Sequence, residues 1–314
     1  MVKPEDVKRV AVIGAGLMGH SIAQVFAQAG IEVALVATRE KSLERAMSMI
    51  NRNLNTLAEF GKVKKGDIPA ILRRIHPTTE LASAACGADF VLETVTEDAD
   101  VKKRIFSELN EACSEDTILS SNTSSLNIFE IAEVRNPGRL VICHWVMPAH
   151  IFRLVDVIPG PPTSPEVVAF TAKLVERLGK RPVVMKKYVP AAIINQIQNG
   201  IGMAVSNMLE NEWAAPEDID LAVKLSLGVR LPILGVVQTL DFTGLDTVYK
   251  VMQSFGISNR LIEEKVNQGH LGTKTSKGIY DYGGRSEEEI LKRRDELCLK
   301  LMDFLDGLTS FKPV

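Results

Sequence analysis

The chain has 314 residues, of which 46% are hydrophobic and 24% are charged, and its formal net charge is −2. At roughly 150 residues per domain, this length predicts two domains that each bury a core. The slightly acidic balance argues against a nucleic-acid-binding surface, and no run of about 18 apolar residues indicates a membrane span. The four scattered cysteines form no CxxC pair and are typical of reduced thiols, so we expect a cytoplasmic protein.

The N-terminal part reads as a strand, a tight turn and a helix. Residues 10–13 are a short apolar run of the kind that a buried parallel strand needs. Gly14, Gly16 and Gly19 interrupt this run, and apolar residues then recur at helical spacing. A second apolar run at residues 33–36 completes a βαβ unit.

Strands and helices continue to alternate up to about residue 187. The expected elements, in chain order, are two helices within residues 42–74, strands at 90–92, 117–119 and 140–142 with a helix at 101–113, and extended segments at 154–158 and 182–185 around a helix at 165–178. This alternation predicts an α/β fold with a mostly parallel, doubly wound sheet of the Rossmann kind.

After residue 187 the pattern becomes helical. The expected helices are residues 191–211, 216–224, 245–255 and 287–308, and no convincing strand remains. We therefore predict a nucleotide-binding domain over residues 1–187 and an all-α domain over residues 188–314.

The glycine turn carries the first functional signal. A GxGxxG pattern alone is weak, but residues 14–19 follow a strand and open a helix, which is the context that dinucleotide binding requires. The first glycine permits the turn, the second lets the backbone approach a pyrophosphate, and the third lets helix and strand pack closely. We expect this turn, including Leu17 and Met18, to contact the cofactor.

The end of the second strand lacks an expected acid. An Asp or Glu about 20 residues after the turn would hold the adenosine ribose, but Ala37 stands at that position. Thr38 and Arg39 suit a 2′-phosphate and hence NADP. Alternatively, Arg39 is a solvated charge and Glu40 contacts the ribose of NAD. The sequence leaves the choice between NAD and NADP open.

A histidine and a carboxylate provide the second signal. His144 lies at the end of one expected strand, and Asp156 lies on the next extended segment. Oxidation of an alcohol by hydride transfer needs a base, and imidazole titrates in the right range. A carboxylate on the other ring nitrogen would fix the tautomer. The chain contains no HExxH, GxSxG or P-loop pattern and no metal-ligand spacing, so we expect no metal.

Taken together, these motifs resemble the L-3-hydroxyacyl-CoA dehydrogenase family over nearly the whole chain. Besides the glycine turn, the matching segments are residues 93–98 with 101–103, 121–126, 216–220, 241–246 and 272–280.

The resemblance implies a Rossmann domain followed by a helical domain that forms a homodimer. It implies that His144 is the base, that Asp156 stands where the family has Glu, and that Ser124 and Asn195 touch substrate or nicotinamide. It further places three residues near the cofactor: Glu97, Lys102 and Lys274. The hairpin around Lys62 resembles the one that contacts CoA in the family, although a solvated basic face has the same composition.

Departures from the family pattern lie around the substrate pocket. Met147 replaces an Asn that helps to seat the nicotinamide, and methionine cannot donate a hydrogen bond. Asp156 is about 1.5 Å shorter in reach than Glu, so the two segments must approach more closely or a water must bridge them. Residues 190–192 and 231–235 also differ from the family. These departures bear on the substrate and not on the fold.

Three functions follow from the sequence. In the first, the chain is an NAD(P)-dependent dehydrogenase of a 3-hydroxyacyl-CoA, such as 3-hydroxybutyryl-CoA. In the second, the same chemistry acts on a small free hydroxy-carboxylate or a pyridine-carboxylate alcohol, with Arg153 or Arg230 holding the carboxylate. In the third, the chain still binds nucleotide but its catalysis has lapsed.

Overall fold

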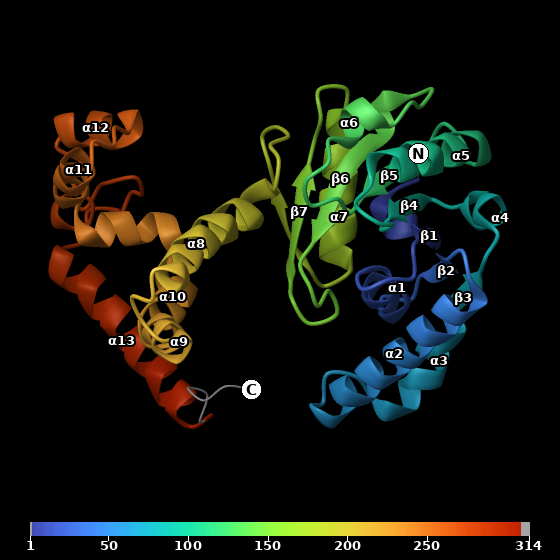
Figure 1. Cartoon of the computed structure of the whole chain (residues 1–314), viewed down its shortest axis with the longest axis horizontal. Coiled ribbons are helices and arrows are strands. Elements are labelled where there is room, and N and C mark those ends of the chain that lie inside the picture. The colour runs from blue at the N-terminus through green and yellow to red at the C-terminus, as the bar shows by residue number, and fades with distance from the viewer. Residues whose placement is uncertain (1, 309–314) are drawn as a thin grey trace. The chain divides into compact units, whose positions relative to one another are not determined.

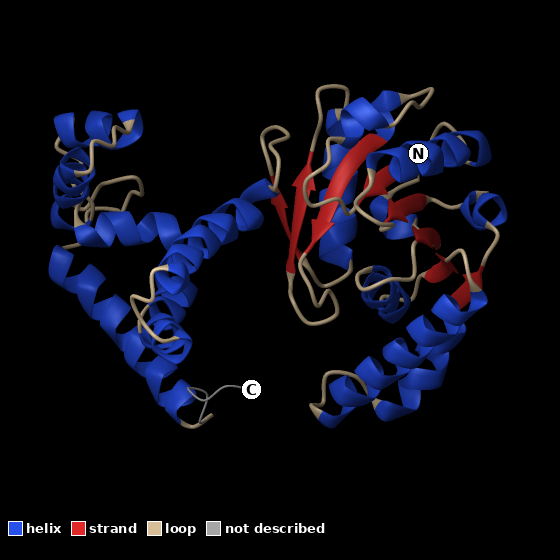
Figure 2. Cartoon of the chain, viewed as in Figure 1, coloured by secondary structure: helices blue, strands red, loops and turns tan. Residues whose placement is uncertain are grey.

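The computed structural model describes residues 2–308, which form two compact units (Figures 1 and 2). The first unit extends to Gly200 and the second begins at Ile201, so the division falls within one helix, α8 (Ala192–Glu210). Within residues 2–308, no helix combines the length and apolar character that crossing a bilayer requires.

The first unit is built on an eight-stranded sheet in the order β3-β2-β1-β4-β5-β6-β7-β8. The strands are β1 (Arg9–Ile13), β2 (Glu32–Val36), β3 (Ile75–Thr78), β4 (Phe90–Glu93), β5 (Ile118–Ser121), β6 (Leu140–Trp145), β7 (Leu154–Ile158) and β8 (Arg181–Val184). β6 and β7 pair antiparallel, whereas the other neighbouring strands pair parallel. The chain crosses over after β3, because β4 returns to pair with β1.

Helices cover both faces of this sheet. They are α1 (Gly19–Gln28), α2 (Glu40–Glu59), α3 (Ile68–Arg73), α4 (Leu81–Ala85), α5 (Ala99–Ala112), α6 (Ile128–Ile131) and α7 (Pro165–Arg177). One buried cluster joins the sheet to α1, α2, α3 and α7, and a second joins its other face to α4, α5 and α6. The predicted doubly wound α/β fold is confirmed. Such a sheet places ligands at the carboxyl ends of its parallel strands.

Among its described residues, the second unit has helices and no strand other than two isolated β-bridges, Gly272 with Lys277 and Lys277 with Asp281. It contains the end of α8, then α9 (Pro216–Leu225), α10 (Leu227–Thr243), α11 (Leu245–Ser254), α12 (Arg260–Asn267) and α13 (Glu287–Asp306). Its polar anchor is Asp241, which is fully buried and accepts hydrogen bonds from the backbone of Ile279 and Tyr280 and from the Tyr282 hydroxyl. These bonds fix the segment after η4 (Thr273–Thr275) against α10.

Candidate active site

The three glycines of the turn between β1 and α1 have different steric surroundings. Gly14 has φ +110°, and a Cβ there would lie 2.7 Å from the carbonyl oxygen of Thr94. A Cβ on Gly19 would lie far inside contact distance of the Gly14 carbonyl. Around Gly16, in contrast, there is nothing within 4 Å of an added Cβ. The turn is therefore closed at two glycines and open at the one whose backbone would approach a pyrophosphate.

A cavity of about 780 Å³ adjoins the turn. Its walls include Gly14, Gly16 and Leu17 from the turn, Thr94–Thr96 from the end of β4, and one side of α5. Met18 does not line it; its side chain is half-buried against the core. The open backbone at Gly16, the N-terminus of α1 and the adjoining cavity fit a dinucleotide.

At the ribose end, the cavity is lined by Ala37, Thr38 and Arg45. Ala37 follows β2 directly, so no carboxylate stands at the usual ribose position. Arg39 and Glu40 are exposed at the start of α2 and do not line the cavity. The sequence missed Arg45, which lies within α2, in the second turn of the helix that follows Arg39.

His144 and Asp156 face each other on adjacent strands. They are register partners in the antiparallel pair β6 and β7, and both are buried, with 4% and 1% of their surfaces exposed. Nδ1 of His144 lies 3.2 Å from Oδ2 of Asp156. A carboxylate can only accept here, so Nδ1 carries the proton and Nε2 is left free to take one. The shorter acid thus reaches the imidazole directly.

Two further side chains converge on Nε2 of His144. The Ser124 hydroxyl lies 3.4 Å away and the Asn195 amide nitrogen 3.5 Å away. Ser124 belongs to the loop after β5, which we call the serine loop (residues 122–126), and Asn195 lies in the first turn of α8. These distances are long for hydrogen bonds, as is common before a substrate is bound. The four predicted catalytic residues are therefore brought together.

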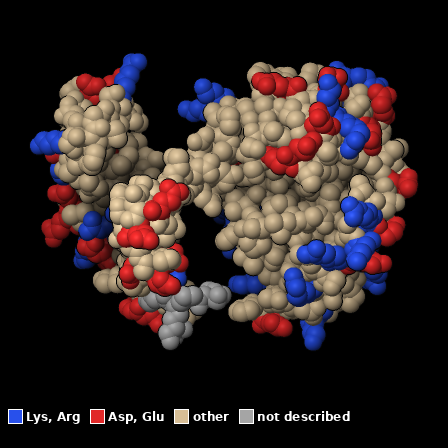
Figure 3. Space-filling model, viewed as in Figure 1, with Lys and Arg blue, Asp and Glu red and all other residues tan. Residues whose placement is uncertain are grey.

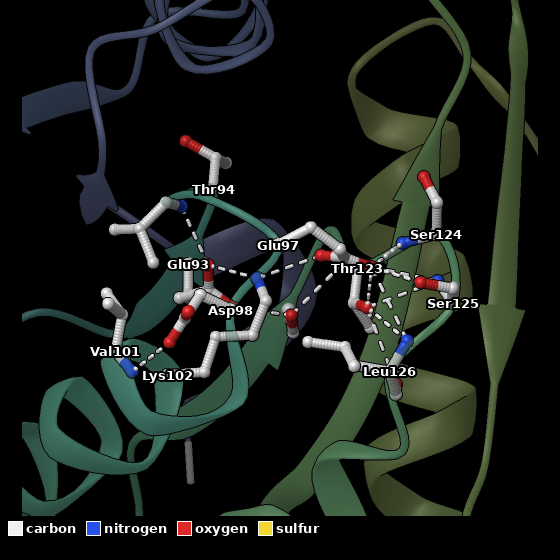
Figure 4. Close-up of polar contacts among 12 residues, drawn as sticks. Glu93, Thr94, Glu97, Asp98, Val101, Lys102, Thr123, Ser124, Ser125 and Leu126 are labelled. Carbon is white, nitrogen blue, oxygen red and sulfur yellow. Dashed lines mark hydrogen bonds and ion pairs between the residues drawn. The ribbon is translucent and has the colours of Figure 1, made fainter.

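Glu97 holds the serine loop from the end of β4 (Figure 4). Its Oε1 accepts hydrogen bonds from the Thr123 hydroxyl at 2.6 Å and from the backbone amides of Ser124 and Ser125 at 2.9 Å each. Burial opposes the charge of this carboxylate. Hydrogen bonds from Thr123 and Ser125, together with the charge of Lys102, outweigh that opposition and hold the pKa of Glu97 at about 2.

Lys102 is buried between two carboxylates. Only 1% of its surface is exposed, and its ammonium lies 2.7 Å from Glu93 Oε1 and 3.3 Å from Glu97 Oε2. The other oxygen of Glu93 accepts from the Ser121 hydroxyl at 2.5 Å. Neither Lys102 nor Glu97 is among the residues that line the nucleotide cavity. The structure thus places both beside the serine loop.

The remaining predicted residues lie outside this cluster. Lys62 is exposed in the turn after α2, and on the face shown in Figure 3 basic side chains gather where α2 and α3 lie. Arg153 is exposed immediately before β7. Lys274 lies in the second unit, where its ammonium is 2.7 Å from the Asp246 carboxylate.

The sequence also missed the residues that hold the loop between β6 and β7. Lys180 is buried and donates to the carbonyl oxygens of Ala149 at 2.5 Å and Phe152 at 2.8 Å. Burial, aided by the charge of Arg153, lowers the pKa of Lys180 to about 8. From α1, the Ser21 hydroxyl accepts from the His150 backbone amide at 3.0 Å. Nothing in the spacing of these residues predicts such contacts.

Across residues 2–308, no group of three or more His, Cys, Asp or Glu side chains is arranged to hold a metal ion.

Comparison with known proteins shows that the chain matches one family over most of its length. Residues 9–188 match the NAD binding domain of 3-hydroxyacyl-CoA dehydrogenase, and residues 193–282 match its C-terminal domain. The 3-hydroxybutyryl-CoA dehydrogenase of Clostridioides difficile is 33% identical, over 87% of this chain and 99% of that protein. The 5-formyl-3-hydroxy-2-methylpyridine 4-carboxylate 5-dehydrogenase of Mesorhizobium japonicum is 29% identical, over 96% of this chain and 99% of that protein. A crystal structure of a 3-hydroxyacyl-CoA dehydrogenase from Archaeoglobus fulgidus superimposes with a TM-score of 0.79 at 31% identity, covering 95% of this chain and 99% of the other.

Proposed function

The chain belongs to the 3-hydroxyacyl-CoA dehydrogenase family, and from that premise we propose that it moves a hydride between a nicotinamide cofactor and C3 of a 3-hydroxyacyl-CoA such as 3-hydroxybutyryl-CoA. It is an NAD(P)-dependent oxidoreductase. The observation that carries the proposal is the buried His144–Asp156 pair, whose free Nε2 faces Ser124 and Asn195.

In this mechanism His144 is the general base. Its Nε2 takes the proton of the substrate hydroxyl, and the Asp156 carboxylate stabilises the imidazolium that forms. Ser124 and Asn195 each direct a donor toward the same point, where they hold the substrate oxygen and stabilise charge that develops on it. The bound nicotinamide supplies the hydride acceptor or donor.

For the cofactor, we propose that the cavity accepts both NAD and NADP. Because Ala37 directly follows β2, no carboxylate stands at the usual ribose position, and Thr38 and Arg45 line the cavity wall beside it. The exposed Arg39 is within the same segment.

Two observations bear on the substrate. The basic hairpin around Lys62 supports a CoA thioester, since its charge suits the phosphates of CoA. Met147, the exposed Arg153 and the similarity to the Mesorhizobium japonicum pyridine-carboxylate dehydrogenase support a small free carboxylate as the second candidate. A protein that binds nucleotide without turnover is the third candidate, and the intact His144 cluster argues against it.

The test is the change in absorbance at 340 nm when purified protein is mixed with acetoacetyl-CoA and either NADH or NADPH. Rapid oxidation is expected with both cofactors, at rates within about tenfold of each other. Acetoacetate and a pyridine-carboxylate aldehyde serve as CoA-free substrates. Turnover of these alone would replace the leading proposal by the second, and cofactor binding without any turnover would favour the third.

We further propose that residues 1–187 bind the cofactor and that residues 188–314 complete the enzyme and form a homodimer, as in the family that the chain resembles.

A further inference from the structure

We propose that Glu97 is a positioning residue, which fixes the serine loop so that the Ser124 hydroxyl faces His144. This inference depends on the proposed dehydrogenase function for its catalytic consequence. It gives Glu97 and Lys102 the role of holding the serine loop.

The hydrogen bonds at Glu97 define the backbone of the loop. Oε1 accepts from the consecutive amides of Ser124, Ser125 and Leu126 at 2.9, 2.9 and 3.4 Å. Three successive N–H groups that point at one oxygen leave the loop little freedom to rearrange. The Thr123 hydroxyl strengthens this arrangement, because it donates to the same oxygen and also accepts from the Leu126 amide at 2.9 Å.

The same contacts select one hydroxyl for catalysis. The loop carries three hydroxyl groups, and those of Thr123 and Ser125 donate to Glu97 at 2.6 and 3.0 Å. The hydroxyl of Ser124 points away from Glu97 (Figure 4) and lies 3.4 Å from Nε2 of His144. The carboxylate thus holds the Thr123 and Ser125 hydroxyls in hydrogen bonds and leaves the Ser124 hydroxyl available to bind the reacting oxygen of the substrate.

An ion pair with the buried Lys102 fixes the position of Glu97, whose own side chain is 37% exposed. Lys102 contacts Glu97 and Glu93, and Glu93 also accepts from the Val95 backbone amide at 2.7 Å. Lys102 and Glu93 are both buried, so removal of either one would leave the charge of the other without its buried partner. Because Thr94–Thr96 also line the nucleotide cavity, one short segment forms a cavity wall and holds Ser124.

The first test compares Glu97→Gln with Glu133→Gln. Glu133 is a matched control because its carboxylate, which is 75% exposed, lies 2.6 Å from Lys103, the α5 residue next to Lys102. In Glu97→Gln, kcat should fall by about tenfold or more, because a small displacement of the Ser124 hydroxyl strongly reduces the rate. The Kd for NADH, from fluorescence titration, should stay within about twofold of wild type. Hydrogen exchange at the amides of residues 124–126 should accelerate. Glu133→Gln should change none of the three.

A double-mutant cycle separates positioning from general loss of structure. In a Ser124→Ala background, Glu97→Gln should lower kcat by no more than about twofold, because its effect passes through the missing hydroxyl. If Glu97→Gln folds poorly, Glu97→Asp, which keeps the charge but shortens the reach, should show a smaller effect in the same three measurements.

Three results would overturn the proposal. The first is unchanged hydrogen exchange at the amides of residues 124–126. The second is an equal fall in kcat with and without Ser124. The third is a tenfold or greater weakening of NADH binding, about 1.4 kcal/mol, as expected for a cofactor ligand. Hydrogen exchange needs no substrate. It therefore decides the role of Glu97 even if the wild-type protein turns over none of the substrates tested, which would contradict the proposed function alone.

Discussion

The contact between His144 and Asp156 follows from strand register. Direct partners in an antiparallel pair project to the same face of the sheet, with Cβ atoms about 4.5–5.5 Å apart. An Asp at this position therefore reaches the imidazole without help, and the extra methylene of Glu is not needed.

Replacing either member of this pair should reduce chemistry and leave cofactor binding intact. We expect His144→Gln to lower kcat by about 10³-fold or more, because no other group takes the proton. Asp156→Asn should lower it by about 10²-fold or more, because an amide that donates to Nδ1 favours the wrong tautomer. Single-turnover oxidation of NADH measures both effects. The control is His76→Gln, which changes an exposed histidine on the edge strand β3 that pairs with Glu32 on β2. A loss of less than tenfold in His144→Gln would exclude it as the base.

The family motifs singled out His144, Asp156, Ser124 and Asn195, and the structure brings these side chains together. Their catalytic roles stay a prediction. The sequence did not predict the surroundings of Glu97 and Lys102, since their partners lie on separate segments, at the end of β4 and in the serine loop. Lys102 was also hard to recognise because a lysine on an amphipathic helix is normally solvated. The fully buried side chain depends on two carboxylates that no local pattern places near it.

At the scale of elements, substitutions in the glycine turn should separate effects on cofactor binding from effects on folding. Gly16 has open space around it, so Gly16→Ala should fold normally and raise the Kd for NADH by about tenfold or more, because its methyl group occupies the approach to the pyrophosphate. Gly19→Ala should instead destabilise the fold by about 1–3 kcal/mol or more, because its methyl group collides with the Gly14 carbonyl. Fluorescence titration and thermal unfolding of both variants check this contrast. Equal effects on stability would contradict it.

Two of the elements that the sequence missed contain residues that normally interrupt them, and a third is short. β3 has only four residues and includes Pro77, which is tolerated because β3 lies at the edge of the sheet. α10 contains Pro232, and Gly235 adopts φ +68° within it, so two helical segments meet at a kink. α12 is a short helix of eight residues. The longer periodic segments, such as α2 and α13, were predicted because their apolar spacing is uninterrupted.

At the scale of the whole molecule, α8, within which the two units divide, leaves apolar side chains exposed. On α8, Ile193, Ile197 and Ile201 recur every four residues and are all exposed. Residues at this spacing share one face of a helix, and an apolar stripe of this kind typically packs against another surface. We expect the stripe to take part in the proposed homodimer.

This expectation gives a prediction about mass. Light scattering coupled to size-exclusion chromatography should give about twice the 34.4 kDa of one chain. Ile201 is 43% exposed, and Ile201→Glu should shift the protein toward monomer, because a charge placed in an apolar interface has to be desolvated. Asn199→Glu is the matched control, since a residue two positions away projects from the opposite side of the helix, and it should remain dimeric. A wild-type mass of one chain at every concentration would exclude the dimer. A dimer that tolerates Ile201→Glu would show that another surface of the helical unit forms the interface.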